Sequence, residues 1–307
     1  MQVHYDINQL PVFNNAVITI GTFDGVHCGH QQVINTLKEA ALQAGGESVI
    51  ITFHPHPRKV VSSAVTGVRL INTLPERIEL IGKTGVDHLV IVPFTEYFAN
   101  QTAEEYISDF LVDKFHPHTI IIGYDHRFGK ERVGDYKLME DKAAQYHYRL
   151  MEIPLHLLDT IKVSSSNIRE AILHCHVEAA NKLLGYDFFF EGEVVHGDKI
   201  GRTLGYPTAN LKSTDEEKIV LGDGIYAVYT EVEGIKYKAM MSIGFRPTVN
   251  GKKRVVEVNI FDFNQDIYGK VIRVYAVKYL RSEVKFDGLE SLKLALNKDK
   301  EDSLEVL

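Results

Sequence analysis

Cysteine is scarce in this sequence, and long apolar runs are lacking. Only two cysteines, Cys28 and Cys175, occur among 307 residues, so a disulfide framework is not expected and a reducing compartment fits. No apolar run approaches the length that crosses a bilayer. The N-terminal residues, MQVHYDINQL, lack the basic start and apolar core of a secretion signal. These features predict a cytoplasmic protein that does not associate with membranes.

The chain also lacks an excess of basic residues. Its 34 Lys and Arg against 41 Asp and Glu give a formal net charge of -7. A general nucleic-acid-binding role is therefore not favoured, because such proteins usually carry a basic surface. A small phosphorylated ligand remains compatible, since a few local groups can hold one. Structural zinc has little support, because no C-x-x-C or H-E-x-x-H accompanies the histidine-rich patches at 54–56, 116–118 and 174–176.

The pattern of the chain changes near residue 186. Before that position, short continuous apolar runs alternate with amphipathic stretches, which is typical of a parallel sheet covered by helices on both faces. Such sheets bind ligands at the carboxyl ends of their strands. The expected strands are residues 16–21, 48–53, 88–94, 119–124 and 150–153, and the expected helices are residues 30–44, 74–83, 102–115, 135–146, 165–174 and 177–184.

The second half reads as β-structure. From Phe188 onward, segments rich in β-branched and aromatic residues are spaced by Gly, Asp and Asn, which predicts an antiparallel barrel or sandwich. A final helix is expected from about Gly288 to the end. The connection near Gly185 is short, so we expect two abutting domains, residues 1–185 and 186–307.

A phosphate-binding turn is predicted where the first expected strand gives way to the first expected helix. The segment Gly21 to Gln31 reads GTFDGVHCGHQ. Helix N-termini offer free N–H groups to phosphates, and glycines let the backbone approach a ligand. His27 and His30, three residues apart, can donate hydrogen bonds to oxygens that gain charge during displacement. The alternative is a helix cap with two incidental histidines.

Three further segments complete the predicted site of the first half. VSSSNIR, Val163 to Arg169, offers hydroxyls and a guanidinium that can bind phosphate or, alternatively, cap a helix. GYDHRFG, residues 123–129, offers Asp125 to a ring N–H, Phe128 to a flat ring and Arg127 to an anion, or is an ordinary polar loop with a buried Phe. TFHPHP, residues 52–57, places His56 toward the cleft or is merely a rigid loop.

The second half carries its own phosphate-binding signal. Residues 197–211 read GDKIGRTLGYPTANL, in which Gly197, Gly201 and Gly205 permit a tight loop around phosphates. Thr208 and Asn210 offer neutral oxygens of the kind that Mg²⁺ prefers. The segment lacks the G-K-[ST] of a Walker loop, and the alternative is a barrel connection punctuated by Gly and Pro.

Glu257 is the candidate proton acceptor. It lies in VVEVNIFDF, and on a strand it shares one face with Asn259. A carboxylate facing inward near a nucleotide can take a proton from a substrate hydroxyl. The alternative, an exposed glutamate on an edge strand, stays open because the pattern does not reveal which face is buried.

In this order the motifs resemble the bacterial bifunctional riboflavin kinase/FAD synthetases. G-x-F-D-G-x-H-x-G-H, T-F-x-P-H-P, G-x-D-x-R-F-G and S-S-x-x-I-R resemble the nucleotidyltransferase module over most of residues 15–185. PTAN, G-I-Y-A-V, G-x-R-P-T and E-x-x-I-F-D-F resemble riboflavin kinase over about residues 186–290, and R-x-E-x-x-F follows at 281–286. The chain departs from the family at Asn259, where His is usual, and at Ser242, where Asn is frequent; both departures concern ligand affinity more than activity.

The resemblance implies an α/β protein with a Rossmann-like nucleotidyltransferase domain built on a parallel sheet. An antiparallel β-barrel riboflavin kinase domain with a terminal helix would follow it. The implied function is FAD synthesis from riboflavin in two ATP-dependent steps. The C-terminal domain phosphorylates riboflavin to FMN, and the N-terminal domain adenylylates FMN to FAD with release of pyrophosphate.

Site residues follow for both reactions. Glu257 is expected to be the general base of the kinase, with Thr208 and Asn210 on the metal, and His27 and His30 are expected to be catalytic in adenylyl transfer. The expected ligand contacts are Gly21, Phe23, Asp24, Gly25, His27, His30, Ser164, Ser165 and Arg169 for the ATP of adenylyl transfer; His56, Asp125, Arg127 and Phe128 for FMN; Gly197, Gly201, Gly205, Thr208 and Asn210 for the ATP of the kinase; and Arg281 and Phe286 for the kinase flavin.

Mg²⁺ is expected with ATP, and no tightly bound redox cofactor is required because flavins are substrate and product. The expected partners are riboflavin, FMN, FAD, ATP, ADP and pyrophosphate, without nucleic acid or membrane, and the sequence does not indicate an oligomeric state. The main alternative is a single-activity FAD synthetase whose barrel only binds flavin. A non-catalytic flavin-binding protein would leave the two histidines unexplained. Another adenylyltransferase, such as one acting on pantetheine phosphate or nicotinamide nucleotide, would leave PTAN unexplained.

Overall fold

A computed structural model describes residues 1–307 except 62–68, 124–125, 154–162, 198–199 and 249–250. The chain divides into two compact units, Met1–Ser164 and Ser165–Leu307. We describe each unit by itself.

The first unit is built on a parallel sheet of six strands in the order β1-β4-β3-β2-β5-β6. All of its strand pairs are parallel, as the continuous apolar runs predicted. The sequence pattern did not predict the edge strand β1, because its sequence, QVH, is short and half polar. The strands are β1 (Gln2–His4), β2 (Val17–Ile20), β3 (Ser48–His54), β4 (His88–Pro93), β5 (Thr119–Gly123) and β6 (Arg149–Ile153).

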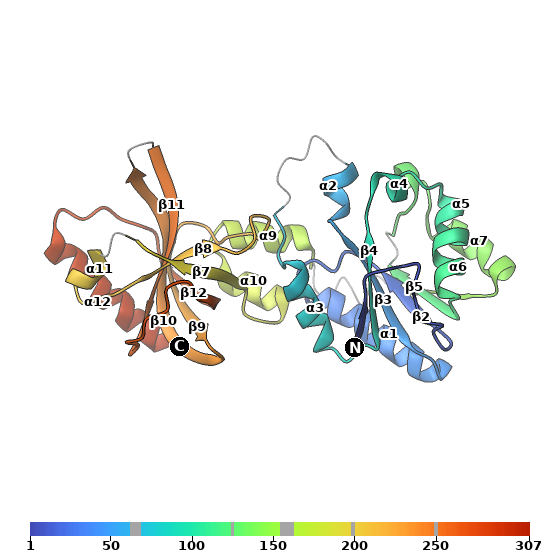
Figure 1. Ribbon diagram of the computed structural model, residues 1–307, viewed down its shortest axis with the longest axis horizontal. Coiled ribbons are helices and arrows are strands. Elements are labelled where there is room, and N and C mark those ends of the chain that lie inside the picture. Colours follow the sequence, from blue (N-terminus) through green and yellow to red (C-terminus); the bar gives the residue numbers. More distant parts are fainter. Residues whose placement is uncertain (62–68, 124–125, 154–162, 198–199, 249–250) are drawn as a thin grey trace. The chain divides into compact units, whose positions relative to one another are not determined.

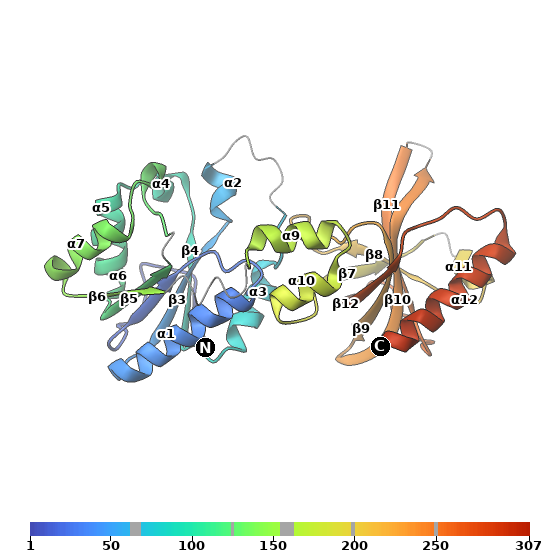
Figure 2. The same ribbon diagram turned by 180° about the vertical axis from the view of Figure 1, so that it is seen from behind.

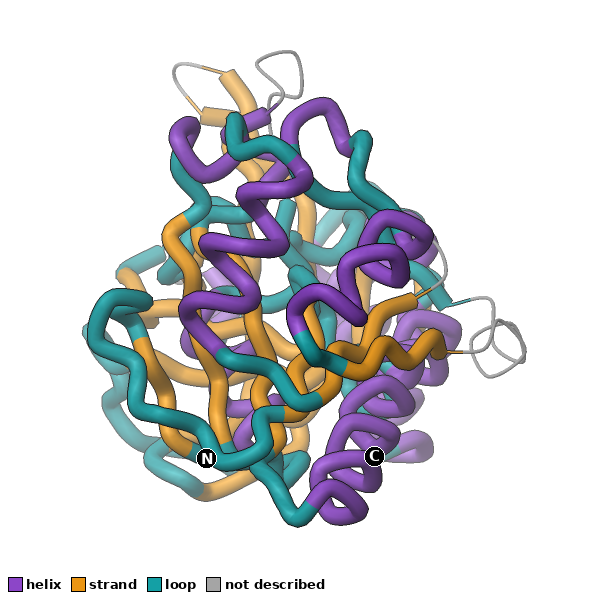
Figure 3. The backbone as a smooth tube through the Cα atoms, turned by 90° about the vertical axis from the view of Figure 1, so that its right-hand side faces the viewer, coloured by secondary structure: helices purple, strands orange, loops and turns teal. Residues whose placement is uncertain are grey.

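Helices cover both faces of this sheet (Figures 1 and 3). Consecutive strand residues such as Val17 and Ile18 enter opposite cores, because side chains alternate along a strand. One core packs beneath α1 (Cys28–Ala44) and α3 (Leu74–Gly82). The other packs beneath α4 (Glu96–Ala99), α5 (Ala103–Glu105), η1 (Tyr106–Val112), α6 (Asp113–Phe115) and α7 (Tyr136–Tyr146). The short α2 (Pro57–Val61) and η2 (Lys130–Arg132) complete the described helices of this unit.

The helix expected over residues 102–115 is present, with a π-helical middle that the sequence pattern did not predict. Thr102 caps its start, and Glu105 returns a hydrogen bond to the cap, so the capping signal is confirmed. The middle, η1, buries Tyr106, Ile107, Phe110 and Leu111 together.

The second unit begins with two helices, α9 (Ser165–Leu173) and α10 (Val177–Leu184), which lie side by side (Figure 2). Asn181 of α10 joins them to the strands that follow. Its amide nitrogen donates to the Ala276 carbonyl at 2.8 Å, and its amide oxygen accepts from the Phe188 N–H at 2.8 Å. The helix pair therefore packs as part of the barrel unit.

Replacing Asn181 by Ala is expected to lower the free energy of unfolding of the second unit by about 2 kcal/mol, because two half-buried backbone groups lose their partner. Urea unfolding of the full chain measures this change. Lys182→Ala, an exposed position on the same helix, serves as the control and is expected to leave the transition unchanged. Equal transitions for the two variants would show that Asn181 does not anchor α10.

The rest of the unit is a closed antiparallel barrel in the order β10-β11-β8-β7-β12-β9. Its strands are β7 (Phe189–Val195), β8 (Ala209–Ser213), β9 (Gly224–Val232), β10 (Ile235–Thr248), β11 (Gly251–Ile260) and β12 (Val271–Arg281). The short α11 (Ile200–Thr203) lies between β7 and β8, and α12 (Leu289–Val306) packs on β9, β10 and β12 (Figure 1). The expected barrel and terminal helix are thus confirmed.

Among the described residues, no helix combines the length and the apolar character that a membrane crossing requires.

Candidate active sites in the two units

The turn after β2 is tightly wound. Phe23, Gly25 and Val26 have φ angles of 49°, 92° and 36°, values that residues other than glycine rarely adopt. The Phe23 ring lies over Gly21, where an added Cβ would come within 3.2 Å of it. The glycine at position 21 thus makes room for the ring, and the turn brings the backbone to the start of α1.

His27 and His30 meet at the start of α1. His27 is the N-cap residue, and its Nδ1 accepts a hydrogen bond from the His30 N–H at 3.2 Å. The two imidazole rings stack with their centroids 3.6 Å apart. Because Nδ1 of His27 is an acceptor, the neutral ring carries its hydrogen on Nε2. The pair predicted from H-x-G-H is therefore brought together at a helix N-terminus.

Asp24 holds the turn against α3. Its side chain is 1% exposed and accepts hydrogen bonds from the backbone N–H groups of Ile71 and Asn72, each at 3.0 Å. Thr73, the next residue, caps α3. The carboxylate therefore supports the predicted ATP-binding turn by fixing the segment that leads into α3.

The surroundings of His30 favour its neutral form. Burial lowers the pKa of His30 well below its ordinary value of 6.5, and the nearby His27 and Arg77 lower it further. Its Nδ1 is buried and has no hydrogen-bond partner within the described part of the chain. A neutral imidazole can donate one hydrogen bond to a phosphate without bringing a charge into the site.

This depressed pKa predicts that the first unit loses stability as the pH falls below 6.5. Below that value the unfolded chain binds a proton that folded His30 does not, so the free energy of unfolding falls by up to about 1.4 kcal/mol per pH unit. Denaturant unfolding at pH 7.5 and 5.5 measures the loss. His30→Gln, which cannot titrate, is expected to reduce it, and the same loss in both proteins would contradict the assignment.

The segments expected to bind FMN are only partly on the surface. His56 is 8% exposed, and its Nδ1 accepts from the Arg58 N–H at the start of α2. Phe128 is 5% exposed and stacks on Tyr106, 4.9 Å between centroids, within the core under α4–α7. Arg127 is exposed and pairs with Asp135 at 2.8 Å, while Asp125 lies outside the described residues. Their contacts with FMN stay predictions.

The serine and arginine residues of VSSSNIR stand at the division between the units. Ser164 is the last residue of the first unit, whereas Ser165 and Arg169 lie in the first turns of α9 in the second. All three have partners within the protein. Their role toward the ATP of adenylyl transfer stays a prediction.

In the second unit, the two faces of β11 border different pockets. Glu257 and Asn259 face a pocket bounded by α12, and Val258 and Ile260 face another pocket bounded by the loop after β11. Because β11 pairs with β10 and β8 inside a closed barrel, it is not an edge strand. Glu257 therefore lines the pocket bounded by α12 and does not lie on an exposed edge strand.

Thr208 borders both pockets. Its hydroxyl donates to Oε1 of Glu257 at 3.1 Å, and Asn210 pairs with Glu257 across β8 and β11. An added Cβ at Gly197 would overlap the Asn210 amide, and one at Gly201 would overlap the Tyr206 carbonyl. Gly197 and Gly201 therefore leave room for the Asn210 side chain and for the Tyr206 backbone next to Thr208.

Asn259, one of the departures from the family pattern, supports the same loop. Its side-chain amide donates to the Pro207 carbonyl at 2.7 Å, directly before Thr208. It therefore positions the PTAN segment from the Glu257 face of β11.

The pocket against α12 is walled by apolar side chains and closed by an ion pair. Arg281 binds both carboxylate oxygens of the buried Asp299 on α12, at 2.7 and 2.6 Å. Its guanidinium lies 5.9 Å from the Phe286 ring centroid. The apolar wall consists of Leu204, Ile225, Met240, Met241, Val284, Phe286, Leu292 and Leu296.

Glu283 is a further carboxylate in this pocket. It is the glutamate of R-x-E-x-x-F, but no role was predicted for it. Burial raises the pKa of Glu283, as do the nearby Asp223 and Glu257 carboxylates, while hydrogen bonds from the Phe245 backbone and the Ser242 side chain act in the opposite direction. Ser242, the other departure from the family pattern, thus helps to hold Glu283 on β10.

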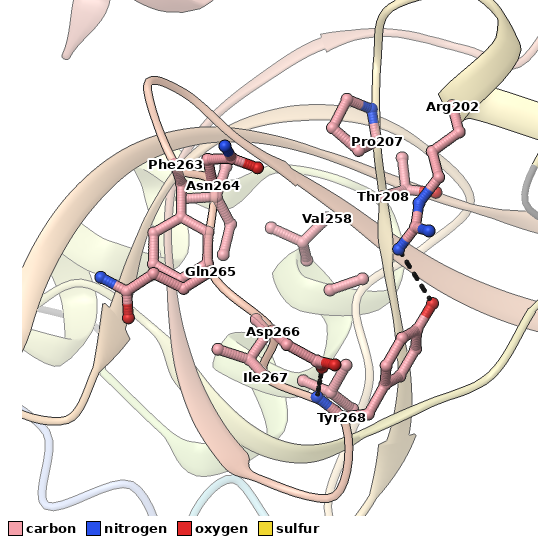
Figure 4. Close-up of a pocket in the computed structure, with 13 residues that line it drawn as sticks. Arg202, Pro207, Thr208, Val258, Phe263, Asn264, Gln265, Asp266, Ile267 and Tyr268 are labelled. Atoms are coloured by element: carbon pink, nitrogen blue, oxygen red, sulfur yellow. Dashed lines mark hydrogen bonds between the residues drawn. The ribbon is translucent and has the colours of Figure 1, made fainter.

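The second pocket was not predicted as a set of residues (Figure 4). The loop from Phe263 to Tyr268 lines it opposite Arg202, Pro207 and Thr208, and Arg202 donates to the Tyr268 hydroxyl at 3.5 Å. The loop begins at Phe263, the last residue of I-F-D-F, and this overlap is the sequence feature that points to the pocket. The pocket combines an aromatic and aliphatic lining with a guanidinium, a suitable combination for a base and a phosphate chain.

Comparison with known proteins agrees with a chain of two functional halves. The family model described as FAD synthetase matches residues 10–167, and that described as riboflavin kinase matches residues 184–307. A bifunctional riboflavin kinase/FMN adenylyltransferase of Bacillus subtilis is 39% identical over 94% of this chain and 92% of its own length. One from Escherichia coli is 34% identical over 96% of this chain and 93% of its own.

Among solved structures, one from Streptococcus pneumoniae described as a macrolide-efflux protein is similar over the whole chain. It has a TM-score of 0.87 and 32% identity and covers 98% of both chains.

Proposed function

Because this chain belongs to the family of bifunctional riboflavin kinase/FMN adenylyltransferases, we propose that Glu257 and the His27–His30 pair perform its two reactions. The chain makes FMN from riboflavin in the barrel unit and FAD from FMN in the sheet unit. We keep the functional boundary at residues 185 and 186, and the start of the riboflavin kinase match at residue 184 supports it. A cytoplasmic location is part of the proposal, and the two free cysteines fit it.

The observation that carries the kinase assignment is Thr208, which borders both pockets and is hydrogen-bonded to Glu257. The apolar pocket against α12 suits the flavin ring, and the pocket of Figure 4 suits ATP. A ribityl hydroxyl beside Glu257 would then face a γ-phosphate beside Thr208. Glu257 accepts the hydroxyl proton as that oxygen attacks phosphorus and ADP leaves.

The oxygens at this junction also fit a magnesium ion. Thr208 and Asn210 contribute neutral oxygens, and the neighbouring Glu257 remains available for the substrate proton. Within the described part of the chain, no cluster of three acidic, His or Cys side chains could hold a metal by itself. A magnesium ion at this junction would take some of its oxygen ligands from the ATP phosphates. When bound, it would neutralise charge on the transferred phosphoryl group. Thr208 and Asn210 orient the phosphates, and Asn259 holds the segment that carries them.

In adenylyl transfer the FMN phosphate is itself the nucleophile, and it is already ionised at neutral pH. It attacks the α-phosphorus of ATP, and the bond to pyrophosphate breaks. No side chain has to remove a proton. The His27–His30 pair donates hydrogen bonds to the crowded phosphate, supported by the N–H groups at the start of α1. Ser164, Ser165 and Arg169 are proposed to hold the leaving pyrophosphate.

A chromatographic time course with riboflavin, ATP and Mg²⁺ tests both assignments of activity. The full chain is expected to produce FMN first and FAD second. Conversion of supplied FMN to FAD without any FMN from riboflavin would instead support the single-activity alternative. Absence of both products, under oxidising and reducing conditions, would refute catalysis in both units.

A further inference from the structure

Arg77 is a buried cation behind the His27–His30 pair, and neither proposed reaction uses it. It lies in the first turn of α3 and is only 4% exposed. Burial of an isolated charge costs free energy, so interactions with the surrounding groups must offset this cost. Among the described residues its Nε–H has no hydrogen-bond partner.

The guanidinium joins the ends of two neighbouring strands. Its Nη1 donates to the Thr22 carbonyl, and its Nη2 donates to the Phe53 carbonyl at 3.3 Å. Thr22 begins the turn that leads to His27, and Phe53 lies at the end of β3 before the loop that carries His56. One side chain therefore fixes both ligand-facing segments at the carboxyl edge of the sheet.

The charges around Arg77 also involve the histidine pair. Asp24 is the acidic group that acts on Arg77, and its oxygens accept the Ile71 and Asn72 N–H groups. His27 on the cap of α1 and Arg77 on α3 are the titratable groups that act on His30. The positive charge disfavours a proton on His30, and it adds to the positive end of α1.

We propose that Arg77 is a positioning residue for adenylyl transfer, which holds the ends of β2 and β3 together and keeps the His27–His30 pair in place for the ATP phosphates. This inference rests on the proposed function of the first unit. It extends that function by a side chain that need not touch either substrate.

Two substitutions separate the effect of the two guanidinium hydrogen bonds from the effect of the positive charge. Arg77→Met removes both, whereas Arg77→Lys keeps the charge but cannot reproduce the two-pronged contact with Thr22 and Phe53. In the full chain with saturating FMN, Arg77→Met is expected to lower kcat for FAD formation about 10- to 100-fold, because small displacements of catalytic groups cost this much. Arg77→Lys is expected to fall between Arg77→Met and the wild type.

The pH profile distinguishes positioning from a merely structural role. Without the guanidinium charge, His30 gains a proton more readily, so the acidic limb of kcat for FAD formation moves to higher pH in Arg77→Met. It stays in place in Arg77→Lys. Arg149→Met, an exposed arginine at the start of β6 on the opposite edge of the sheet, is the control and should match the wild type.

Circular dichroism of the same preparations during denaturant unfolding gives the folded fraction of the first unit, and riboflavin phosphorylation shows that the second unit is intact. If Arg77→Met shows wild-type kcat, KM for MgATP and pH profile for FAD formation, the positioning role is overturned while the proposed function stands. If kcat falls only in proportion to the folded fraction, with an unmoved acidic limb, Arg77 is structural and the proposal fails. Absence of FAD formation in the wild type would instead refute the function on which it rests.

Discussion

Replacing Glu257 by Gln is expected to lower riboflavin phosphorylation by about 10²- to 10⁴-fold, the range typical of a lost general base. Glutamine preserves the size of the side chain and can still accept the hydrogen bond from Thr208. It cannot take up the proton of the ribityl hydroxyl. Initial rates of FMN formation measure the loss, and adenylylation of supplied FMN by the same variant should remain at the wild-type rate.

Glu283 provides a matched control, because it is another glutamate in the same pocket and is tied to β10 by Ser242 and Phe245. Glu283→Gln is expected to raise KM for riboflavin with little change in kcat. If Glu283→Gln abolishes phosphorylation while Glu257→Gln retains it, the proton acceptor has been assigned to the wrong carboxylate.

Replacing His30 by Ala is expected to lower FAD formation from supplied FMN by about 10²- to 10³-fold, the cost of removing a donor from a developing oxyanion. The variant also loses the ring that stacks on His27 at 3.6 Å. FMN formation from riboflavin should continue, so FMN is expected to accumulate in the time course. Chromatographic separation of FMN and FAD measures both effects in one sample.

His30→Gln tests whether the imidazole acts as a neutral donor. Its side-chain amide offers an N–H at about the reach of Nε2 and cannot be protonated. Because the surroundings of His30 keep its pKa low, glutamine is expected to recover part of the activity that alanine loses. Equal losses in the two variants would indicate that His30 works as a charged or proton-transferring group instead.

Much of the fold could be predicted because its signals are local. Continuous apolar runs such as Ser48–Phe53 identify buried parallel strands, and the Thr102–Glu105 capping box identifies a helix start. The edge strand Gln2–His4 has no such signal, since three half-polar residues form a strand only by pairing with β4. The π-helical turns at Tyr106–Val112 likewise depend on tertiary packing.

The candidate sites were predictable to the extent that their residues adjoin in sequence. His27 and His30 meet because one turn and one helix start hold both, and Thr208 lies in a motif with a recognisable composition. The contact of Thr208 with Glu257 joins residues 49 positions apart. Nothing in VVEVNIFDF specifies that its alternate side chains face two different pockets, because that follows from closure of the barrel. Arg77 lacked a local signal for the same reason, since its partners lie far away in sequence, Thr22 in the turn after β2 and Phe53 near the end of β3.

The shared border at Thr208 has a consequence for inhibitor design. Two pockets of different chemistry adjoin at one side chain. If they bind flavin and ATP as proposed, a single compound that carries a flavin-like ring and a purine-like ring on a short tether is expected to occupy both. Once one ring is bound, the second binds at a high effective concentration, and the combined affinity exceeds that of either ring alone. Enzymes that offer only one of the two pockets would bind such a compound through half of its contacts, so selectivity would come from the tether rather than from either ring.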